Sequence, residues 1–285
     1  MNNYFVVITG AASGIGRAIC ENYNRKGVAV YAIDKNILEL ESLATSLQNN
    51  FNTDFFTYIT DLSIKEEIEK LSFDILSKIN NRKLILINNA GANLISGFMK
   101  DTPLEGFEWL MKTNLWSIVY LSQNLLPYMH AKNEGHIVNV SSVFGLFGVK
   151  TCVPYCTSKF AVRGYTEALR MELARTNIYT TCVHPGGIRT NINVNSKLMG
   201  SKINEDTKER VNKLFLKQAR TSPDIAAQNI VDAIENKKLR LLIGADAKVF
   251  DIIVRLFPAR YQQVFDLITK IFYPKSLNNI DKVYS

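Results

Sequence analysis

The chain has 285 residues, of which 47% are hydrophobic, 10% aromatic and 21% charged, with a formal net charge of +8. These values exclude a disordered or collagen-like chain, and four cysteines are too few for a small disulfide scaffold. The excess of basic residues lies in 197–220 and 240–285. Neither segment contains a nucleic-acid-binding motif, so we do not expect the protein to bind nucleic acid. We expect these charges to form a solvated face, with a surface for an anionic partner as the alternative.

The start of the chain, Met1–Tyr4, has no basic segment and leads directly into a strand-like stretch, so we expect no signal peptide and a cytoplasmic protein. In a reducing compartment the four cysteines are expected to be free thiols, because no C-x-x-C pair suggests zinc or redox exchange. His130, His136 and His184 are spaced without a metal-ligand pattern, so no metal is expected.

Short apolar runs alternate with longer segments of helical period over the first two thirds of the chain. This alternation is typical of an α/β fold with a parallel sheet. The expected strands are Phe5–Thr9, Val28–Ile33, Asp54–Ile59, Leu84–Asn88, Gly135–Ser141, Ile178–Val183 and Arg240–Ile243. The expected helices include Ile15–Lys26, Lys65–Ile79, Phe107–His130 and Tyr155–Arg175. No linker or repeat interrupts the pattern, so one catalytic domain is expected over 1–244.

Two late parts of the chain depart from this alternation. Residues 191–221 are polar at first and carry a short amphipathic piece at Val211–Ala219, which predicts an irregular insertion. Beyond Gly244, the apolar segments 249–257 and 264–272 are separated by Pro258 and predict a helical extension over 245–285. Both segments are too short and too charged to cross a bilayer.

A glycine-rich turn, Thr9–Gly16, follows the first strand and opens the first helix. Glycines permit a tight turn and let the backbone approach a pyrophosphate, whose charge is stabilised by the N–H groups at the helix start. The turn therefore predicts a dinucleotide cradle, although its G-x-x-x-G-x-G spacing departs from the usual fingerprint. The cofactor contacts predicted from this turn are Gly10, Ser13, Gly14, Ile15 and Gly16.

Asp34 ends the second strand, 18 residues after Gly16, where a carboxylate can accept both hydroxyls of the adenosine ribose. It would repel a 2′-phosphate, which favours NAD; Lys35 and Arg17 nearby leave NADP as the alternative. Asp61 and Leu62 follow the third strand and are predicted to contact the adenine, with an Asp61 N-cap of the next helix as the equal alternative.

Tyr155 and Lys159 lie four residues apart on an expected helix and so share one face. The spacing alone is weak, since Tyr31/Lys35 and Tyr128/Lys132 have it too. Only Tyr155 follows Ser141 and Ser142 at the end of a strand. A nearby ammonium is expected to lower the pKa of the phenol, as acid/base chemistry near neutral pH requires.

In this order along the chain, six motifs resemble the short-chain dehydrogenase/reductase family over about residues 4–243. They are Thr9–Gly16, Asn88–Gly91, Asn114, Ser142, Tyr155/Lys159 and Pro185–Thr190. The resemblance implies a Rossmann-type, doubly wound sheet of seven parallel strands. It also implies hydride transfer between a nicotinamide and an alcohol or carbonyl.

The resemblance further implies a role for each matching residue. Tyr155 would exchange the proton, Ser142 would hold the substrate oxygen, and Lys159 would bind the nicotinamide ribose. Asn114 would bind a water molecule of a proton relay. The alternative for Asn114 is a solvent-facing residue without a function. The other implied cofactor contacts are Asn88, Ala90, Gly91, Pro185, Gly186, Ile188 and Thr190. The resemblance implies that the motif Asn88–Gly91 supports the central sheet beside the adenosine, and that the backbone of Ile188 lies against the nicotinamide carboxamide. Segment 191–220 would form the substrate lid, and the protein would be a homodimer or homotetramer.

The apolar segment 143–149 favours a lipophilic substrate, with simple core packing as the alternative. The extension resembles those of family members that act on steroids, retinoids or other lipids. We expect it to cover the pocket, to form a subunit contact or to lie on a membrane surface through 245–275.

The leading hypothesis is an NAD-dependent dehydrogenase of a lipophilic secondary alcohol or ketone. The alternatives are an NADPH-dependent carbonyl or 3-oxoacyl reductase, and a non-catalytic cofactor-sensing protein on the same fold.

Overall fold

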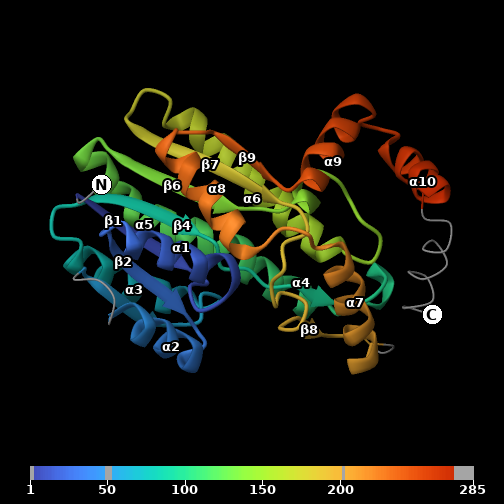
Figure 1. Cartoon of the computed structure of the whole chain (residues 1–285), viewed down its shortest axis with the longest axis horizontal. Coiled ribbons are helices and arrows are strands. Elements are labelled where there is room, and N and C mark those ends of the chain that lie inside the picture. Colours follow the sequence, from blue (N-terminus) through green and yellow to red (C-terminus); the bar gives the residue numbers. More distant parts are fainter. Residues whose placement is uncertain (1–2, 49–52, 201–202, 273–285) are drawn as a thin grey trace.

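The computed structural model describes residues 3–48, 53–200 and 203–272 (Figure 1). Seven strands form one sheet in the order β3-β2-β1-β4-β6-β7-β9, and every neighbouring pair is parallel. The strands are β1 (Tyr4–Thr9), β2 (Ala29–Asp34), β3 (Phe55–Ile59), β4 (Lys83–Asn88), β6 (Gly135–Val140), β7 (Ile178–Pro185) and β9 (Arg240–Ile243). The order reverses between β1 and β4, which confirms the expected doubly wound α/β sheet.

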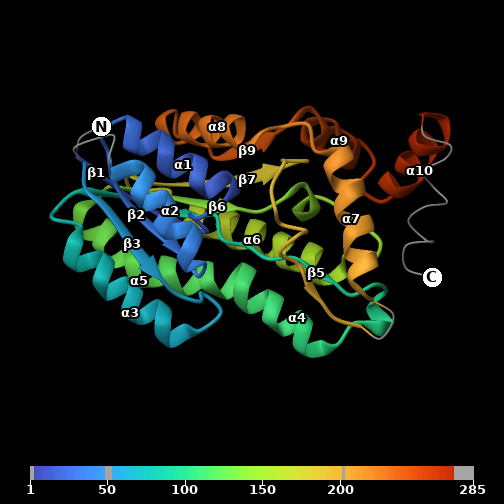
Figure 2. The ribbon, with the colours of Figure 1, turned by 60° about the horizontal axis from the view of Figure 1, so that its bottom comes forward.

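Helices cover both faces of this sheet (Figure 2). One face carries α1 (Gly14–Arg25), α2 (Ile37–Gln48) and α8 (Pro223–Glu235); the other carries α3 (Lys65–Lys78), α5 (Ser117–Lys132) and α6 (Val153–Glu172). Along β1, Val6 and Ile8 point into the first core and Phe5 and Val7 into the second. A strand covered on both sides has to be apolar throughout, which is why the strands were predictable as continuous apolar runs.

The segment expected to form one helix, Phe107–His130, is part of a longer run of helix whose winding changes in the middle. It consists of α4 (Leu104–Met111), a π-helical turn at Lys112–Trp116 and α5. The π turn holds Asn114 with its side chain completely buried. The alternative that Asn114 is a solvent-facing residue without a function is therefore wrong.

The segment predicted to be irregular contains more regular structure than expected. Its first part forms the short strand β8 (Lys197–Leu198), which pairs with β5 (Leu94–Ile95) from the chain after β4. Helix α7 (Glu205–Gln218) then replaces the short amphipathic piece at Val211–Ala219. Asn204 caps this helix by accepting a hydrogen bond from the Thr207 N–H at 3.0 Å. Figures 1 and 2 place α7 and the β5/β8 pair at one end of the sheet.

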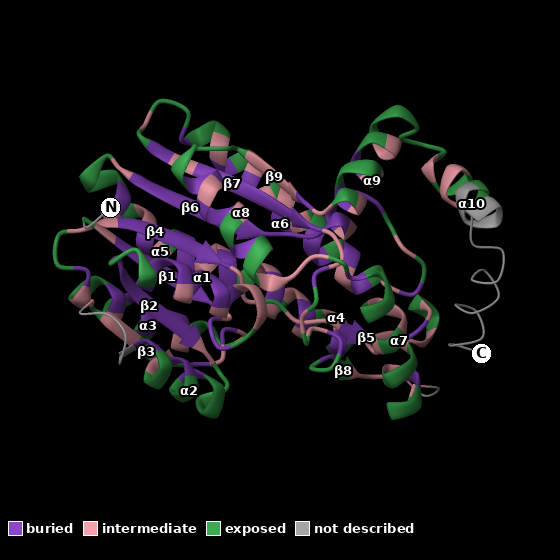
Figure 3. Ribbon diagram, in the orientation of Figure 1, coloured by how far each residue is buried: buried purple, intermediate pink, exposed green. Residues whose placement is uncertain are grey.

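The extension forms two helices, α9 (Ala245–Leu256) and α10 (Tyr261–Phe272), at that same end (Figure 1). Helix α9 starts directly after Gly244, one residue beyond β9. Its Ala247 is fully buried in a third cluster with Val143, Leu146 and Phe147. Figure 3 shows that the opposite side of α9 is largely exposed. The described part of the extension thus packs on the loop between Ser142 and Tyr155, and its outer side is left to solvent.

Candidate active site

The glycine-rich turn between β1 and α1 is closed in a way that only glycine allows. Gly10 and Gly14 have positive φ angles of 64° and 53°. A Cβ on Gly16 would lie 2.0 Å from the carbonyl oxygen of Gly10. Ser13 is the exposed N-cap of α1, and its side chain makes no capping bond. The first amides of a helix lack intrahelical partners, so the turn with Ile15 presents N–H groups suited to a phosphate.

Two side chains that belong to the quoted motifs but were not predicted as site residues hold this turn against β4. The hydroxyl of Thr9 accepts hydrogen bonds from the N–H groups of Asn89 and Ala90 at 3.0 and 2.9 Å. The Asn89 side chain donates to the carbonyls of Thr9 and Gly10 at 3.0 and 3.1 Å. A Cβ on Gly10 would lie 2.9 Å from the Cα of Ala90, so the two loops are in contact. Asn89 and Thr9 therefore fix the shape of the turn.

Asp34 lies at the carboxyl end of β2 beside the same turn. Its carboxylate accepts hydrogen bonds from the N–H of Ala12 and the N–H of Asn36, each at 3.0 Å. Arg17, one of the two basic residues considered for an adenosine phosphate, pairs with Glu21 at 3.1 Å and lies 3.7 Å from Glu39. The negative charge of Asp34 is thus oriented by two backbone amides, and the nearby guanidinium is already engaged.

Asp61 and Leu62 lie just beyond β3. The Asp61 carboxylate accepts a hydrogen bond from the Ser63 N–H at 2.9 Å, whereas the N-cap position of α3 is held by Ile64. The alternative of an Asp61 N-cap is therefore wrong. The side chain of Leu62 is buried in the core beneath α3 and α5. Contact with an adenine through Asp61 remains a prediction.

Asn88 ends β4 and points its side chain into the sheet. Its amide donates to the Asn139 side chain at 2.8 Å and to the Ser122 hydroxyl at 3.3 Å, and Asn139 donates to Thr166 at 3.0 Å. These buried bonds join β4 and β6 to α5 and α6. The side chain of Asn88 thus supports the sheet, as its motif implies, and a cofactor contact is left to the backbone around it.

Ser142 and Tyr155 come together from the end of β6 and the first turn of α6. The Ser142 hydroxyl accepts a hydrogen bond from the Phe144 N–H at 3.1 Å, and its carbonyl accepts from His184 at 3.0 Å. Phe144 packs edge-on against the ring of Tyr155, with centroids 6.2 Å apart. Burial raises the pKa of Tyr155, and a hydrogen bond with the Ser142 side chain opposes that rise.

This direction corrects the expectation of a lowered tyrosine pKa. The ammonium of Lys159 lies 5.8 Å from the centroid of the Tyr155 ring and donates to the carbonyl of Val140 at 3.0 Å. Burial lowers the pKa of Lys159 to about 8, because a charged group loses hydration inside the protein. Desolvation dominates at both groups, and the lysine retains most of its charge near neutral pH.

Asn114 is anchored from both sides within the π-helical turn. Its carboxamide accepts a hydrogen bond from the Ala92 N–H at 2.8 Å and donates to the Ala92 carbonyl at 3.0 Å. It also donates to Ser158 at 3.0 Å, next to Lys159 on α6. A Cβ on Gly91 would lie 3.2 Å from the Lys159 ammonium and 3.5 Å from the Asn114 oxygen. Both polar groups therefore border the backbone of Gly91, where π turns often mark functional sites.

The loop Pro185–Thr190 after β7 faces the glycine-rich turn. A Cβ on Gly14 would lie 3.0 Å from the methyl carbon of Thr190. Thr221 donates its N–H to Gly187 and accepts from the N–H of Arg189, which makes an isolated parallel bridge opposite Ile188. These bonds use the residues on either side of Ile188, so its own N–H and carbonyl take no part in the bridge.

The predicted residues therefore gather along the carboxyl ends of β1, β2, β4, β6 and β7, on both sides of the point where the strand order reverses. This is where ligands bind in doubly wound sheets. The cradle closed by Gly10 and Gly16, the amides of the α1 start and the fixed Asp34 suit a dinucleotide. Within the described residues, no group of three His, Cys, Asp or Glu side chains is arranged to hold a metal ion.

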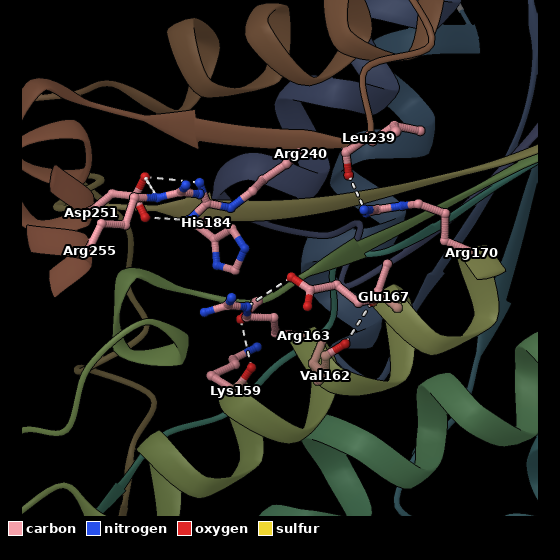
Figure 4. Close-up of polar contacts among 12 residues, drawn as sticks. Lys159, Val162, Arg163, Glu167, Arg170, His184, Leu239, Arg240, Asp251 and Arg255 are labelled. Atoms are coloured by element: carbon pink, nitrogen blue, oxygen red, sulfur yellow. Dashed lines mark hydrogen bonds and ion pairs between the residues drawn. The ribbon is translucent and has the colours of Figure 1, made fainter. Parts of the chain in front are cut away.

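The cysteines near Tyr155 and the buried histidine behind Ser142 have structural surroundings. Burial raises the pKa of Cys152 to about 12 and also raises that of Cys156. Burial lowers the pKa of His184 to about 4, so its ring is neutral and donates to the Ser142 carbonyl. Figure 4 shows His184 beside the ion pair of Arg240 and Asp251. The thiols are therefore poor nucleophiles, and the histidine orients the serine.

Comparison with known proteins agrees with this arrangement. A family profile described as short chain dehydrogenase matches residues 4–199. The oxidoreductase SadH of Mycobacterium tuberculosis is 32% identical over 273 residues, which cover 94% of this chain and 96% of SadH. Mouse dehydrogenase/reductase SDR family member 7B is 30% identical over 85% of this chain and 74% of its own length.

Solved structures share the fold. A short-chain dehydrogenase from Streptomyces avermitilis superposes with a TM-score of 0.77 at 26% identity and covers 92% of this chain and 98% of its own. A short-chain dehydrogenase/reductase from Burkholderia phymatum, solved with NAD, gives a TM-score of 0.80 at 22% identity over 90% and 94% of the two chains.

Proposed function

This chain belongs to the short-chain dehydrogenase/reductase family and is an NAD(P)-dependent oxidoreductase, and on that premise we propose that it transfers a hydride between NAD and a lipophilic secondary alcohol or its ketone. The observation that carries the proposal is the convergence of Ser142, Tyr155, Lys159 and Asn114 beside a dinucleotide cradle that ends in Asp34. A hydroxysteroid or a long-chain secondary alcohol has the required chemistry.

The preference for NAD rests on the surroundings of Asp34. A carboxylate already oriented by the amides of Ala12 and Asn36 accepts hydrogen bonds from ribose hydroxyls and repels a 2′-phosphate. Arg17, which would offset that repulsion, is engaged by Glu21 and Glu39. Among the two basic residues considered, only the exposed Lys35 is left to favour NADP. The relatives solved with NAD and with NADP⁺ show that the fold accommodates either dinucleotide, so the choice falls to these side chains.

In the proposed reaction, Tyr155 in its ionised form would accept the proton of the substrate hydroxyl, and Ser142 would hold the same oxygen. When bound, the nicotinamide would accept the hydride that leaves the carbinol carbon. Burial raises the pKa of Tyr155, so the phenol is protonated in this state and needs a positive neighbour to ionise. Lys159 is that neighbour, and it bonds the Val140 carbonyl on its other side.

Asn114 completes the proposed path for the proton. Its oxygen and the Lys159 ammonium both border Gly91, and its amide is held by Ala92 and Ser158. A carboxamide fixed in this way can hold a water molecule between the lysine and solvent. The role of Asn114 would be to complete this relay, which carries the phenol proton of Tyr155 toward solvent before the tyrosine takes the substrate proton and again before the next turnover.

A lipophilic substrate is supported by the wall beside Tyr155. Phe144 contacts the tyrosine ring directly and packs on Phe147 at 5.8 Å. Phe147 itself is buried against Phe250 at 5.2 Å and Phe265 at 5.0 Å, as the core-packing alternative expects, so Phe144 is the aromatic residue that carries the support. An apolar wall favours a large apolar substrate over a sugar, since sugars need many polar partners. The lid, residues 191–220 with α7, would close over this substrate.

The proposal is tested by initial rates with NAD and NADP over a panel from short alcohols and sugars to long-chain secondary alcohols and hydroxysteroids. We expect NAD to be preferred and kcat/KM to rise with the apolar area of the substrate. The Tyr155→Phe variant should lose turnover, whereas Tyr165→Phe, ten residues further along α6, should keep it. Preference for NADPH with acyl ketones would instead identify a carbonyl or 3-oxoacyl reductase.

We also propose that the outer side of the extension lies on an anionic membrane surface. Val249, Ile252 and Leu256 are spaced three and four residues apart on α9 and are 52%, 56% and 68% exposed. Lys248 and Arg255 are exposed residues of the same helix, and Arg255 also bonds Asp251. This pattern fits an interfacial helix. No helix in the described residues is long and apolar enough to span a bilayer. Flotation with phosphatidylserine vesicles tests the proposal, and equal recovery with neutral vesicles or none would contradict it.

A homodimer or homotetramer is proposed through the exposed sides of α5 and α6. Trp116, directly before α5, is 44% exposed, and Phe160 and Met171 on α6 are 40% and 75% exposed. Light scattering should give a dimer or tetramer that Met171→Glu weakens. A wild-type monomer at micromolar concentration would contradict the proposal.

A further inference from the structure

The start of the extension contacts the loop that is expected to hold the nicotinamide. Asp246, in the first turn of α9, accepts a hydrogen bond from the N–H of Gly187 at 2.7 Å. A Cβ on Gly186 would lie 2.3 Å from both carboxylate oxygens, and a Cβ on Gly244 would lie 2.3 Å from one of them. Gly244 also has a positive φ of 99°. The carboxylate therefore fills a space that two glycines leave for it.

This contact completes a set of bonds around the same loop. Gly186 donates to the carbonyl of Ile243 at 2.9 Å, and Thr221 exchanges bonds with the residues on both sides of Ile188. The loop is thus bonded to β9 behind it, to Thr221 on one side and to Asp246 on the other. The backbone groups of Ile188, which take no part in the bridge, are the ones expected to face the nicotinamide carboxamide.

The position of Asp246 is itself fixed by the rest of α9. Arg240 on β9 makes two bonds to Asp251, at 2.9 and 2.5 Å, and Arg255 adds a third at 3.0 Å (Figure 4). These cations lower the pKa of Asp251 below its usual range, so it is charged at neutral pH. One turn earlier on the same side of the helix, Ala247 is fully buried against Phe147 and its neighbours. Helix α9 is held at both its polar and its apolar contacts and cannot shift without breaking one of them.

We propose that Asp246 is a positioning residue of the cofactor site, which fixes the loop Pro185–Ile188 so that the extension becomes part of the nicotinamide pocket. The inference rests on the proposed placement of the nicotinamide beside Ile188, but not on the identity of the substrate. The bond from an amide to a carboxylate is charge-assisted and worth more than a neutral one. Its loss frees the loop and weakens binding of the nicotinamide end, while the adenosine end keeps Gly10 to Gly16 and Asp34.

The test uses two ligands that differ only at the end in question. NADH and ADP-ribose share the adenosine and pyrophosphate, and ADP-ribose lacks the nicotinamide. We expect Asp246→Ala in the full chain to raise the Kd of NADH at least tenfold while leaving the Kd of ADP-ribose within twofold, measured by isothermal titration. The control Asp266→Asn removes an exposed carboxylate of the same extension and should change neither constant.

If Asp246→Ala does not fold, Asp246→Asn keeps the side-chain size and one acceptor, and it should show a smaller loss confined to NADH. The Michaelis constant for NAD should rise more than kcat falls. Unchanged NADH affinity in the folded variant, or an equal loss for ADP-ribose, would overturn the proposal. Failure of wild-type protein to oxidise any lipophilic alcohol would leave these binding constants intact, so it would be recognised as a failure of the proposed substrate.

Discussion

Replacing Lys159 by methionine should abolish turnover and stabilise the protein at neutral pH. Burial lowers the pKa of this lysine from 10.5 to about 8. At 1.36 kcal/mol per pKa unit, holding the charged ammonium in place costs the folded state about 3 kcal/mol at pH 7. Methionine removes that cost and leaves the Val140 carbonyl without its donor, a loss of about 1–2 kcal/mol. The net gain at pH 7 is therefore about 1–2 kcal/mol.

The sign of this gain depends on pH. The folded pKa lies below the unfolded one, so between pH 8 and 10.5 the unfolded chain binds more protons and wild-type stability rises with pH. The advantage of Lys159→Met over wild type should fall by about 2 kcal/mol between pH 7 and pH 9.5. Urea unfolding of both proteins at the two pH values measures this difference.

The matched control is Lys70→Met, which removes an exposed lysine on α3 and should give the same difference from wild type at both pH values. If Lys159→Met were destabilised by an equal amount at pH 7 and pH 9.5, burial of the lysine charge would not destabilise the folded protein. The claim that the active-site lysine lowers the free energy of unfolding would then be wrong.

Three further variants test separate parts of the site. Gly16→Ala should weaken NADH binding at least tenfold in a fluorescence titration, because its Cβ would lie 2.0 Å from the Gly10 oxygen; unchanged binding would refute the cradle. Asn114→Ala leaves both backbone groups of Ala92 unpaired and should lower kcat about tenfold or more, with the NADH Kd nearly unchanged. A parallel loss of binding would indicate a structural role only. Asp34→Ser should shift the ratio of kcat/KM values by at least tenfold toward NADP, and a ratio that stays constant would contradict the role of that carboxylate.

The sheet was predictable because both of its faces are covered. Continuous apolar runs such as Leu84–Asn88 fit a strand buried on two sides, and their observed bounds lie within two residues of the expected ones. Helix α7 was only partly found, since its first half is polar and its start is set by the Asn204 cap. The π turn at Asn114 adds a single residue to the winding of the helix. A change this small cannot be detected from the hydrophobic periodicity of a long helix.

Within the site, the sequence identified the residue types and missed several of their partners. Asn88 and Asn89 are adjacent at the end of β4, and side chains alternate along a strand, so they point to opposite sides. Asn88 supports the sheet, whereas Asn89 bonds the glycine-rich turn. The raised pKa of Tyr155 depends on burial, which spacing does not reveal. Asp246 is distant in sequence from the loop it holds, and its role appears only when β7 and β9 are placed side by side.

The most direct test of the central claim is a comparison of initial rates with NAD and NADP on a hydroxysteroid, a long-chain secondary alcohol and a short polar alcohol, using wild type and Tyr155→Phe. The account predicts turnover with NAD that is highest on the apolar alcohols and is lost in the variant. Preference for NADP, reaction only with the short polar alcohol, or full activity of Tyr155→Phe would contradict it.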